Sequence, residues 1–218
     1  MTQENEGADD IFEAVRARML AAALPHVADS GWETALQRAS EGEDADIAAL
    51  AFAGGAEALV LHFFAEGDRR MVEALGEADL SAMRIRDKIR AAVKLRLEAD
   101  KAHREAVRRG IAFLALPGRM AAGAGRLYAC VDAIWRGIGD RSTDFNFYSK
   151  RGILALVVGS TTLFWLEDGS DGQEASWRFL DRRIDDVMAF EGAKARARGL
   201  CAGGEGLWEA LGRLRYPG

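Results

Sequence analysis

The sequence contains little of what a metal site, a disulfide framework or a secretory signal requires. Its 218 residues include two cysteines, three histidines and three prolines. Cys130 and Cys201 stand far apart, with no Cys-x-x-Cys pair and no Cys/His cluster, which argues against structural zinc and disulfide cross-links. The N-terminus, MTQENEGADD, is acidic and has no apolar core, unlike a secretory signal. We therefore expect a protein of a reducing compartment whose first ten residues are disordered.

Motifs of catalytic sites are absent from the sequence as well. It contains no GxSxG, GxGxxG or HExxH motif and no phosphate-binding loop. His26, His62 and His103 are each isolated from any nucleophile motif, and the five-residue spacing of Glu98 and His103 does not fit the Glu-x-x-His pattern of di-iron sites. We predict that the protein is not an enzyme and has no metal or cofactor of its own.

Helix-forming residues dominate the composition. Alanine, leucine, arginine and glutamate are abundant, and apolar residues recur every three or four positions. This favours an all-α fold with short helices before residue 65, of which the first ends near Pro25 and the next is capped by Asp29 or Ser30. Further helices are expected at 80–116, with a break near 99–102 and a stop before Pro117, and at 125–138, 144–166 and 174–190. The apolar run at 152–166 has 15 residues, whereas a membrane-spanning helix needs about 20. Because the run is apolar on all sides, we expect it to be buried by a plain core, a partner subunit or a ligand.

Charge is distributed unevenly along the chain. Residues 1–83 carry a net charge of −12, and residues 84–109 carry +6. The pattern at 31–64 resembles the helix-turn-helix of tetracycline-repressor-type regulators, but residues 29–68 hold nine acids and a single base, Arg38. Because Lys and Arg supply the phosphate contacts of DNA-binding proteins, we expect a vestigial helix-turn-helix and no nucleic-acid partner, with transcriptional regulation as the alternative function. The basic segment predicts a solvated helix face, with contact to anionic lipid headgroups as its alternative.

A charged and aromatic stretch, GDRSTDFNFYSKRG at 139–152, opens the apolar run. Together with the ILA that follows, it closely resembles the signature of the ubiquinone (coenzyme Q) biosynthesis accessory lipid-binding proteins, which occur in mitochondria and α-proteobacteria. The segments at 83–98, 103–117 and 177–188 resemble helices of the same family. The resemblance covers about residues 11–190, and we interpret the chain as a bacterial, α-proteobacterial member.

This resemblance implies a tetracycline-repressor-like helical bundle that forms a homodimer through 144–166 and 174–190. It implies a protein without chemistry of its own, which takes an isoprenoid quinone intermediate from the membrane and presents it to the di-iron demethoxyubiquinone hydroxylase. We expect a bound isoprenoid quinone or phospholipid in an apolar pocket. The predicted lipid-binding residues are Leu127, Val131, Trp135, Leu154, Val158, Thr161 and Trp165.

The signature also implies the surface that binds the hydroxylase. Carried over to this chain, the residues are Asp144, Phe147, Tyr148 and Arg151. Steps of three and four place them on neighbouring faces of the first two helical turns, and aromatic and arginine side chains are favoured interface anchors. The family has Trp at position 147, so Phe147 keeps the aromatic ring but lacks the indole N–H donor.

The C-terminal segment follows a glycine-rich link at 199–206. Its apolar side consists of Leu207, Trp208, Leu211 and Leu214, which correspond to the family's membrane helix; docking on the protein's own core is the alternative. We therefore divide the chain into a disordered N-terminus (1–10), a helix-turn-helix-like subdomain (11–78), a lipid-binding and dimerisation body (79–192) and a linker with a membrane-associating helix (193–218). The predicted location is the cytoplasm, peripheral on the inner face of the cytoplasmic membrane.

Overall fold

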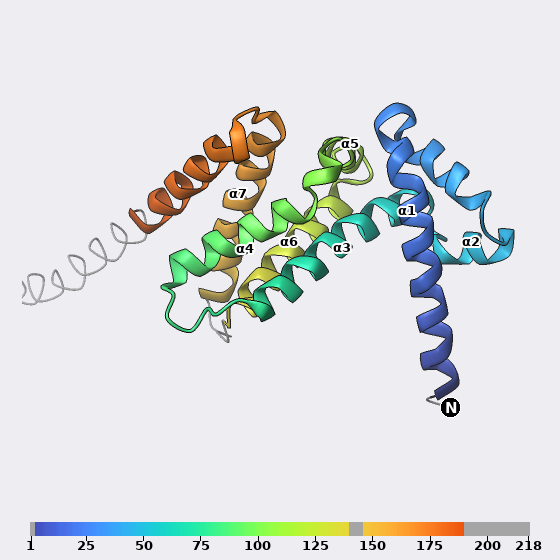
Figure 1. Ribbon diagram of the computed structural model, residues 1–218, viewed down its shortest axis with the longest axis horizontal. Coiled ribbons are helices and arrows are strands. Elements are labelled where there is room, and N and C mark those ends of the chain that lie inside the picture. The colour runs from blue at the N-terminus through green and yellow to red at the C-terminus, as the bar shows by residue number, and fades with distance from the viewer. Residues whose placement is uncertain (1–2, 140–145, 190–218) are drawn as a thin grey trace, which may run out of the picture.

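The computed structural model describes residues 3–139 and 146–189, and the side chains of 11–139 and 151–189. Its helices are α1 (Gln3–Ser40), α2 (Ala45–Ala51), α3 (Gly55–Glu77), α4 (Ile85–Ala99), α5 (Arg104–Leu114), α6 (Met120–Gly137), α7 (Asn146–Glu167) and a last helix at 174–189. Short 3₁₀ turns occupy Lys101–His103 and Asp171–Gln173. None of the described residues forms a strand, so the predicted all-α fold is confirmed (Figure 1).

The helices form two regions that share one hydrophobic core. Figure 1 shows α3, α4 and α6 running side by side, with α1 and α2 at one end and α7 with the last helix at the other. α3 contacts both α4 and α6, and α1 contacts α2, α3 and α5. The largest fully buried side chains include Trp32, Phe63, Met71 and Trp165, which come from both regions. The predicted division into domains stays a prediction.

The first helix differs from its prediction. The sequence pattern placed a helix end near Pro25 and a cap at Asp29 or Ser30, but α1 continues through Pro25 and bends at Gly31 instead. Gly31 has φ 77° and ψ 174°, a conformation in the left-handed region that glycine adopts at no steric cost. Ser30 caps no helix; its hydroxyl donates back to the carbonyl oxygen of His26 (2.9 Å).

Basic side chains of α4 hold the last helix (174–189) against α4. Arg90 pairs with Asp181 (2.5 Å) and Arg86 with Asp185 (2.8 Å), while the ammonium of Lys94 lies 5.2 Å from the ring centre of Trp177. The predicted solvated face is therefore partly a docking face for another part of the chain.

A carboxylate organises the turn that precedes the last helix. Asp168 is buried and accepts hydrogen bonds from the backbone N–H of Ser170 (2.8 Å) and from the N–H (2.8 Å) and hydroxyl (2.6 Å) of Ser176. Ser170 in turn accepts from the N–H of Ala175 (3.0 Å). These contacts satisfy N–H groups that the first turn of a helix otherwise leaves without a partner.

Membrane-span criteria are not met by any single helix in the described part of the chain. α2 and α3 reach the required length and hydropathy only when they are taken together, and they are bent by 63° at their junction.

Candidate functional site

A cavity of about 350 Å³ lies between α3, α4, α5, α6 and α7. Its volume is within the range of small-molecule sites, and most of its lining is aliphatic or aromatic. The apolar lining comprises Phe64 of α3, Leu97 of α4, Val107, Ile111, Leu114 and Ala115 of α5 and the turn after it, Met120, Ala124 and Leu127 of α6, and Val158, Leu163 and Trp165 of α7. Five helices therefore line a space suited to an apolar ligand.

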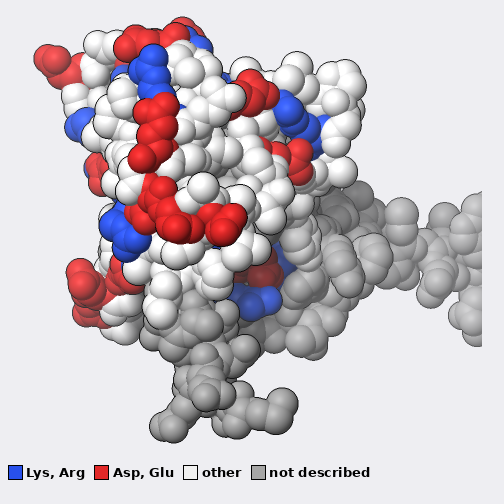
Figure 2. Space-filling view, turned by 90° about the vertical axis from the view of Figure 1, so that its right-hand side faces the viewer, with Lys and Arg blue, Asp and Glu red and all other residues white. Residues whose placement is uncertain are grey.

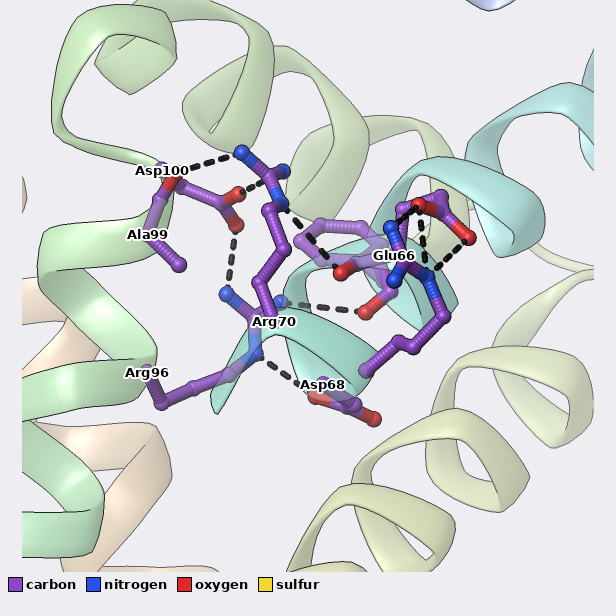
Figure 3. Close-up of polar contacts among 8 residues, drawn as sticks. Glu66, Asp68, Arg70, Arg96, Ala99 and Asp100 are labelled. Atoms are coloured by element: carbon purple, nitrogen blue, oxygen red, sulfur yellow. Dashed lines mark hydrogen bonds and ion pairs between the residues drawn. The ribbon is translucent and has the colours of Figure 1, made fainter. Parts of the chain in front are cut away.

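One wall of this cavity is charged. We call Asp68, Arg96, Asp100 and Arg126 the polar wall; all four line the cavity. Arg96 is buried, and its Nε donates to Asp68 (2.6 Å) while one of its terminal nitrogens donates to Asp100 (2.5 Å). The second terminal nitrogen donates to the carbonyl oxygen of Phe64 (3.2 Å). Figure 3 shows the Arg96 guanidinium between the two carboxylates.

Two further arginines complete this network. Arg126 of α6 pairs with the second oxygen of Asp68. Arg70 of α3 pairs with Asp100 (3.2 Å) and donates to the carbonyl oxygen of Ala99 (2.9 Å), at the end of α4 (Figure 3). Desolvation alone would lower the pKa of Arg96, but the carboxylates of Asp100 and Asp68 outweigh it and raise the pKa. The Arg96 guanidinium therefore stays charged although it is buried.

A glycine gives the Arg96 guanidinium its place. A Cβ atom at Gly67 of α3 would lie 2.5–2.7 Å from the end atoms of Arg96, so only glycine leaves room for the guanidinium against the α3 backbone. Beside the wall, burial and the carboxylate of Asp68 raise the pKa of the Cys130 thiol to about 12. Cys130 is thus a neutral side chain in the cavity lining at physiological pH.

Three of the seven predicted lipid-binding residues line the cavity: Leu127, Val158 and Trp165. The remaining four are buried in the core outside the lining; they are Val131, Trp135, Leu154 and Thr161. On α7, the cavity side includes Gly159 and Thr162 in their place. The side of α7 that faces the cavity is thus turned around the helix axis from the predicted side, since neighbouring residues point about 100° apart around an α-helix.

Sequence reasoning missed the polar wall and the contribution of α5. A signal was present, because Ile89, Val93 and Leu97 mark the inward face of α4 and both Arg96 and Asp100 fall on that face. Two opposite charges four residues apart on an apolar face indicate a buried ion pair. Val107 and Ile111 show the same spacing along α5, so periodicity could have pointed to their burial.

The predicted partner-binding residues are largely outside the described part. Asp144 and the side chains of Phe147 and Tyr148 are not among the described residues, and neither are Leu207, Trp208, Leu211 and Leu214. Arg151 is described and is 2% exposed. Its guanidinium pairs with Asp132 of α6 (2.8 Å), so this side chain holds α7 to α6 and does not lie on the surface that a partner could reach.

Metal ligands are not gathered anywhere in the described residues, where no group of three or more His, Cys, Asp or Glu side chains could hold an ion. The absence of a metal from the protein stays a prediction.

Comparison with known proteins connects this architecture to one family. The family model described as COQ9 matches residues 120–191. The chain is 34% identical to the mitochondrial ubiquinone biosynthesis protein COQ9 of Rattus norvegicus over 185 residues, which are 81% of this chain and 59% of the rat protein. For the proteins of the same name from Xenopus tropicalis and Homo sapiens, the identities are 33% and 32%, with 86% and 81% of this chain and 62% and 58% of theirs covered. The chain thus spans about three fifths of the length of these curated relatives.

The fold has a neighbour among solved structures. A TetR transcriptional regulator from Nitrosomonas europaea superposes with a TM-score of 0.65, covering 78% of this chain and 95% of the regulator at 19% sequence identity. The tetracycline-repressor-like fold predicted from the sequence is therefore confirmed.

One prediction fails in this comparison. We predicted a bacterial protein of the cytoplasm, peripheral on the inner face of the cytoplasmic membrane; this location is wrong, because the relatives are named as mitochondrial proteins of animals. The family resemblance itself is confirmed, because these relatives match over 81–86% of this chain and the family model matches residues 120–191; the chain is a homologue of the COQ9 proteins.

Proposed function

We propose that this protein is a non-catalytic lipid-binding protein of ubiquinone biosynthesis. It holds an isoprenoid quinone intermediate, taken from the membrane, in the cavity between α3 and α7 and presents it to the demethoxyubiquinone hydroxylase. The observation that carries the proposal is an apolar cavity of about 350 Å³ in a homologue of proteins named for ubiquinone biosynthesis.

The exposed surface of α7 supports the proposed homodimer. Leu156 is 75% exposed and Leu163 56% exposed, although α7 is otherwise a core helix. Phe164 of α7 stacks on Phe179 of the last helix, with ring centres 4.5 Å apart, which continues the apolar surface from one helix to the next. Exposed apolar patches of this kind mark sites where proteins associate, so a second copy covering α7 and 174–189 fits them.

A pair of glycines on α7 allows a direct test of lipid binding. Gly159 lines the cavity, and a Cβ atom there meets nothing within 4 Å. Gly159→Leu should therefore add side-chain volume to the cavity, and native mass spectrometry of the purified protein should show less bound isoprenoid lipid than for the wild type. Gly152→Leu is the matched control, because Gly152 has the same free space on the same helix but is outside the cavity lining. Wild-type protein that carries no lipid and has no affinity for isoprenoids would contradict the proposal.

The hydroxylase and membrane contacts need separate experiments. Phe147→Lys should abolish binding of the hydroxylase while the melting temperature is retained; unchanged binding would remove Phe147 from the proposed surface. Deletion of 200–218 should lower binding to anionic liposomes, and equal binding by the shortened protein would favour docking of this segment on the body instead.

Transcriptional regulation is the second candidate, because the neighbouring solved structure is a regulator with the same fold. Figure 2 views the molecule from the side of α1 and α2 and shows a band of acidic groups across this face, with basic groups around it. Residues 29–68, which include the helix-turn-helix, hold nine acids and only Arg38 as a base. Such a surface repels phosphate, so we expect no shift of duplex DNA in a gel assay at low micromolar protein; a salt-dependent shift would revive this function.

A further inference from the structure

The short helix α2 exposes its large apolar side chains and buries its small ones. Ala48 and Ala51 are buried, whereas Ile47 is 38% exposed and Leu50 is 63% exposed. A surface helix ordinarily turns its larger apolar side chains towards the core, because their burial contributes most to folding. Packing on the body therefore accounts for the two alanines of α2 but not for Ile47 and Leu50.

The position of α2 in the fold relates this exposure to binding. The part of α1 after Gly31, the turn at 41–44 and α2 form the helix-turn-helix, and α2 is its second helix. In DNA-binding proteins, the outward side chains of this second helix contact the DNA. Here the exposed side chains, which we call the outer face of α2, are Asp46, Ile47, Ala49 and Leu50. The outer face of α2 is thus exposed as in a binding helix but lacks the Lys and Arg that phosphate requires.

An open groove between α1 and α2 adjoins this face. Leu50 lines the groove together with Phe12, Glu13 and Arg16. Arg16 offers no free cation there, because one terminal nitrogen pairs with Glu13 (2.6 Å) and its Nε donates to the carbonyl oxygen of Ala51 (2.9 Å). The groove therefore extends the apolar surface of Leu50 to the ring of Phe12 without adding an unpaired charge.

The unpaired charges around this surface are negative. Residues 11–54 hold seven acids and three bases, and a band of acidic groups crosses this side of the molecule in Figure 2. The Arg18 guanidinium is held by both carboxylate oxygens of Glu43 (2.7 and 2.9 Å), whereas Asp46 forms no ion pair with any described residue. The carboxylate of Asp44 accepts from two backbone N–H groups of the first turn of α2 (3.0 and 3.2 Å), which closes this helix end to other anions.

We propose that the outer face of α2 and the adjoining groove bind a partner protein through a basic amphipathic helix. The apolar side of that helix packs on Ile47 and Leu50, and its Lys and Arg side chains face the carboxylates around them. Nucleic acids and anionic membranes would bring phosphates to an acidic surface, and a second copy would bring the same acidic surface to itself. This inference concerns a different part of the molecule from the cavity and does not depend on lipid binding.

Two model peptides test the chemistry of the partner. In one fluorescent peptide, leucine recurs every three or four positions and lysine fills the others; the second has glutamate in place of lysine. Binding to the wild-type full chain is followed by fluorescence anisotropy. We expect the lysine peptide to bind, with an affinity that falls as salt rises because the charges are screened, and the glutamate peptide not to bind. Equal binding of both peptides, or binding of neither, would overturn the inference while lipid binding stands.

Leu50→Ala separates this surface from the general acidity of the protein. The variant keeps the net charge but loses an apolar anchor, so the lysine peptide should bind about tenfold more weakly. Val72→Ala is the matched control, because Val72 of α3 is 40% exposed and lines neither the groove nor the cavity. This variant should bind the peptide as the wild type does. Equal affinities of the two variants would show that the peptide binds elsewhere and would contradict the proposal.

Asp46→Asn tests the acidic part of the surface. The variant should bind the lysine peptide about threefold more weakly at low salt and show a smaller dependence on salt. Glu77→Gln is the control with the same change in net charge, since Glu77 of α3 is exposed and forms no ion pair with a described residue. Equal effects of both substitutions would attribute binding to the charge of the whole protein and overturn the proposal.

Two further measurements on Leu50→Ala test the other occupants of this surface. A lower mass than the wild type in analytical ultracentrifugation would assign the outer face of α2 to a second copy. Weaker binding to liposomes with unchanged binding of the lysine peptide would assign it to the membrane. Either result would overturn the proposal; unchanged mass and liposome binding, together with the weaker peptide binding, would support it.

Discussion

A single methyl group on α3 tests the position of the Arg96 guanidinium. Gly67→Ala would place a Cβ atom 2.5 Å from one terminal nitrogen of Arg96 and 2.6 Å from its central carbon. A contact with the end of a flexible side chain usually costs little, because the side chain moves away. Here the guanidinium is held by Asp68 at 2.6 Å and by Asp100 at 2.5 Å, so it cannot move without loosening two buried ion pairs.

Two effects of opposite sign determine how much Gly67→Ala changes the free energy of unfolding. Replacing glycine by alanine in a helix stabilises by about 0.5–1 kcal/mol. Inserting a methyl group into a filled site costs about 1–3 kcal/mol, and complete loss of a buried pair costs about 3–5 kcal/mol. Subtracting the gain in helix propensity from the cost of the clash, we expect Gly67→Ala to lower the free energy of unfolding by about 1 kcal/mol, and by at most about 2.5 kcal/mol if both ion pairs stay intact.

Gly76→Ala is the matched control for this substitution. Gly76 belongs to the same helix, and a Cβ atom there meets nothing within 4 Å, so only the helix-propensity gain of about 0.5–1 kcal/mol remains. Urea unfolding followed by circular dichroism, at one protein concentration for all variants, measures both changes. If Gly67→Ala is as stable as Gly76→Ala, the Arg96 guanidinium does not lie against the α3 backbone and the description of the polar wall is wrong.

Three further outcomes follow from other parts of the fold. Desolvation raises the pKa of the Asp168 carboxyl, but hydrogen bonds from Ser176 and Ser170 outweigh it and lower that pKa. The contribution of Asp168 to folding stability is therefore complete above the unfolded-state pKa of about 3.9, and it is lost as the pH falls towards the lower pKa of the folded state. Asp168→Asn should be less stable at pH 7 and lose less stability than the wild type between about pH 5 and pH 3 in thermal unfolding, and parallel curves would contradict this. Burial raises the pKa of Cys130 to about 12, so in a Cys201→Ser background the thiol should react with a disulfide reagent at pH 8 only after unfolding; rapid labelling of folded protein would show that the cavity is open to solvent. Leu156→Lys, at an exposed position of α7 outside the cavity lining, should shift the proposed homodimer towards monomer in analytical ultracentrifugation, and an unchanged mass would remove this surface of α7 from the interface.

Periodicity predicted most of the helices because each buries a defined face. The pattern over 80–116 predicted one amphipathic segment with a break near 99–102 and a stop before Pro117, and the structure has α4, a 3₁₀ turn at Lys101–His103 and α5 ending at Leu114. The break places the carboxylate of Asp100 where Arg96 and Arg70 can both reach it. The bend of α1 could not be predicted from Pro25, because it depends on the left-handed conformation of Gly31.

The cavity was less predictable than the helices, for a physical reason. Periodicity indicates which face of a helix is inward, but it does not indicate whether that face meets other side chains or an open space. On α7, which is apolar all round, Val158 lines the cavity while Leu154 packs in the core, although both were predicted to bind the lipid. Only the arrangement of five helices distinguishes them.

The basic residues of α4 lie on two sides of the helix, one facing the polar wall and the other facing the last helix. Arg90 pairs with Asp181 of the last helix, whereas Arg96 lies six residues further, about 240° around the helix, and faces the core. The outward pair is partly exposed and contributes little, about 0–1 kcal/mol. The inward cluster requires the desolvation of two arginines and two carboxylates, and apolar residues of similar volume are often as stabilising as a buried ion pair. Stability is therefore a poor reason for placing these charges at the cavity.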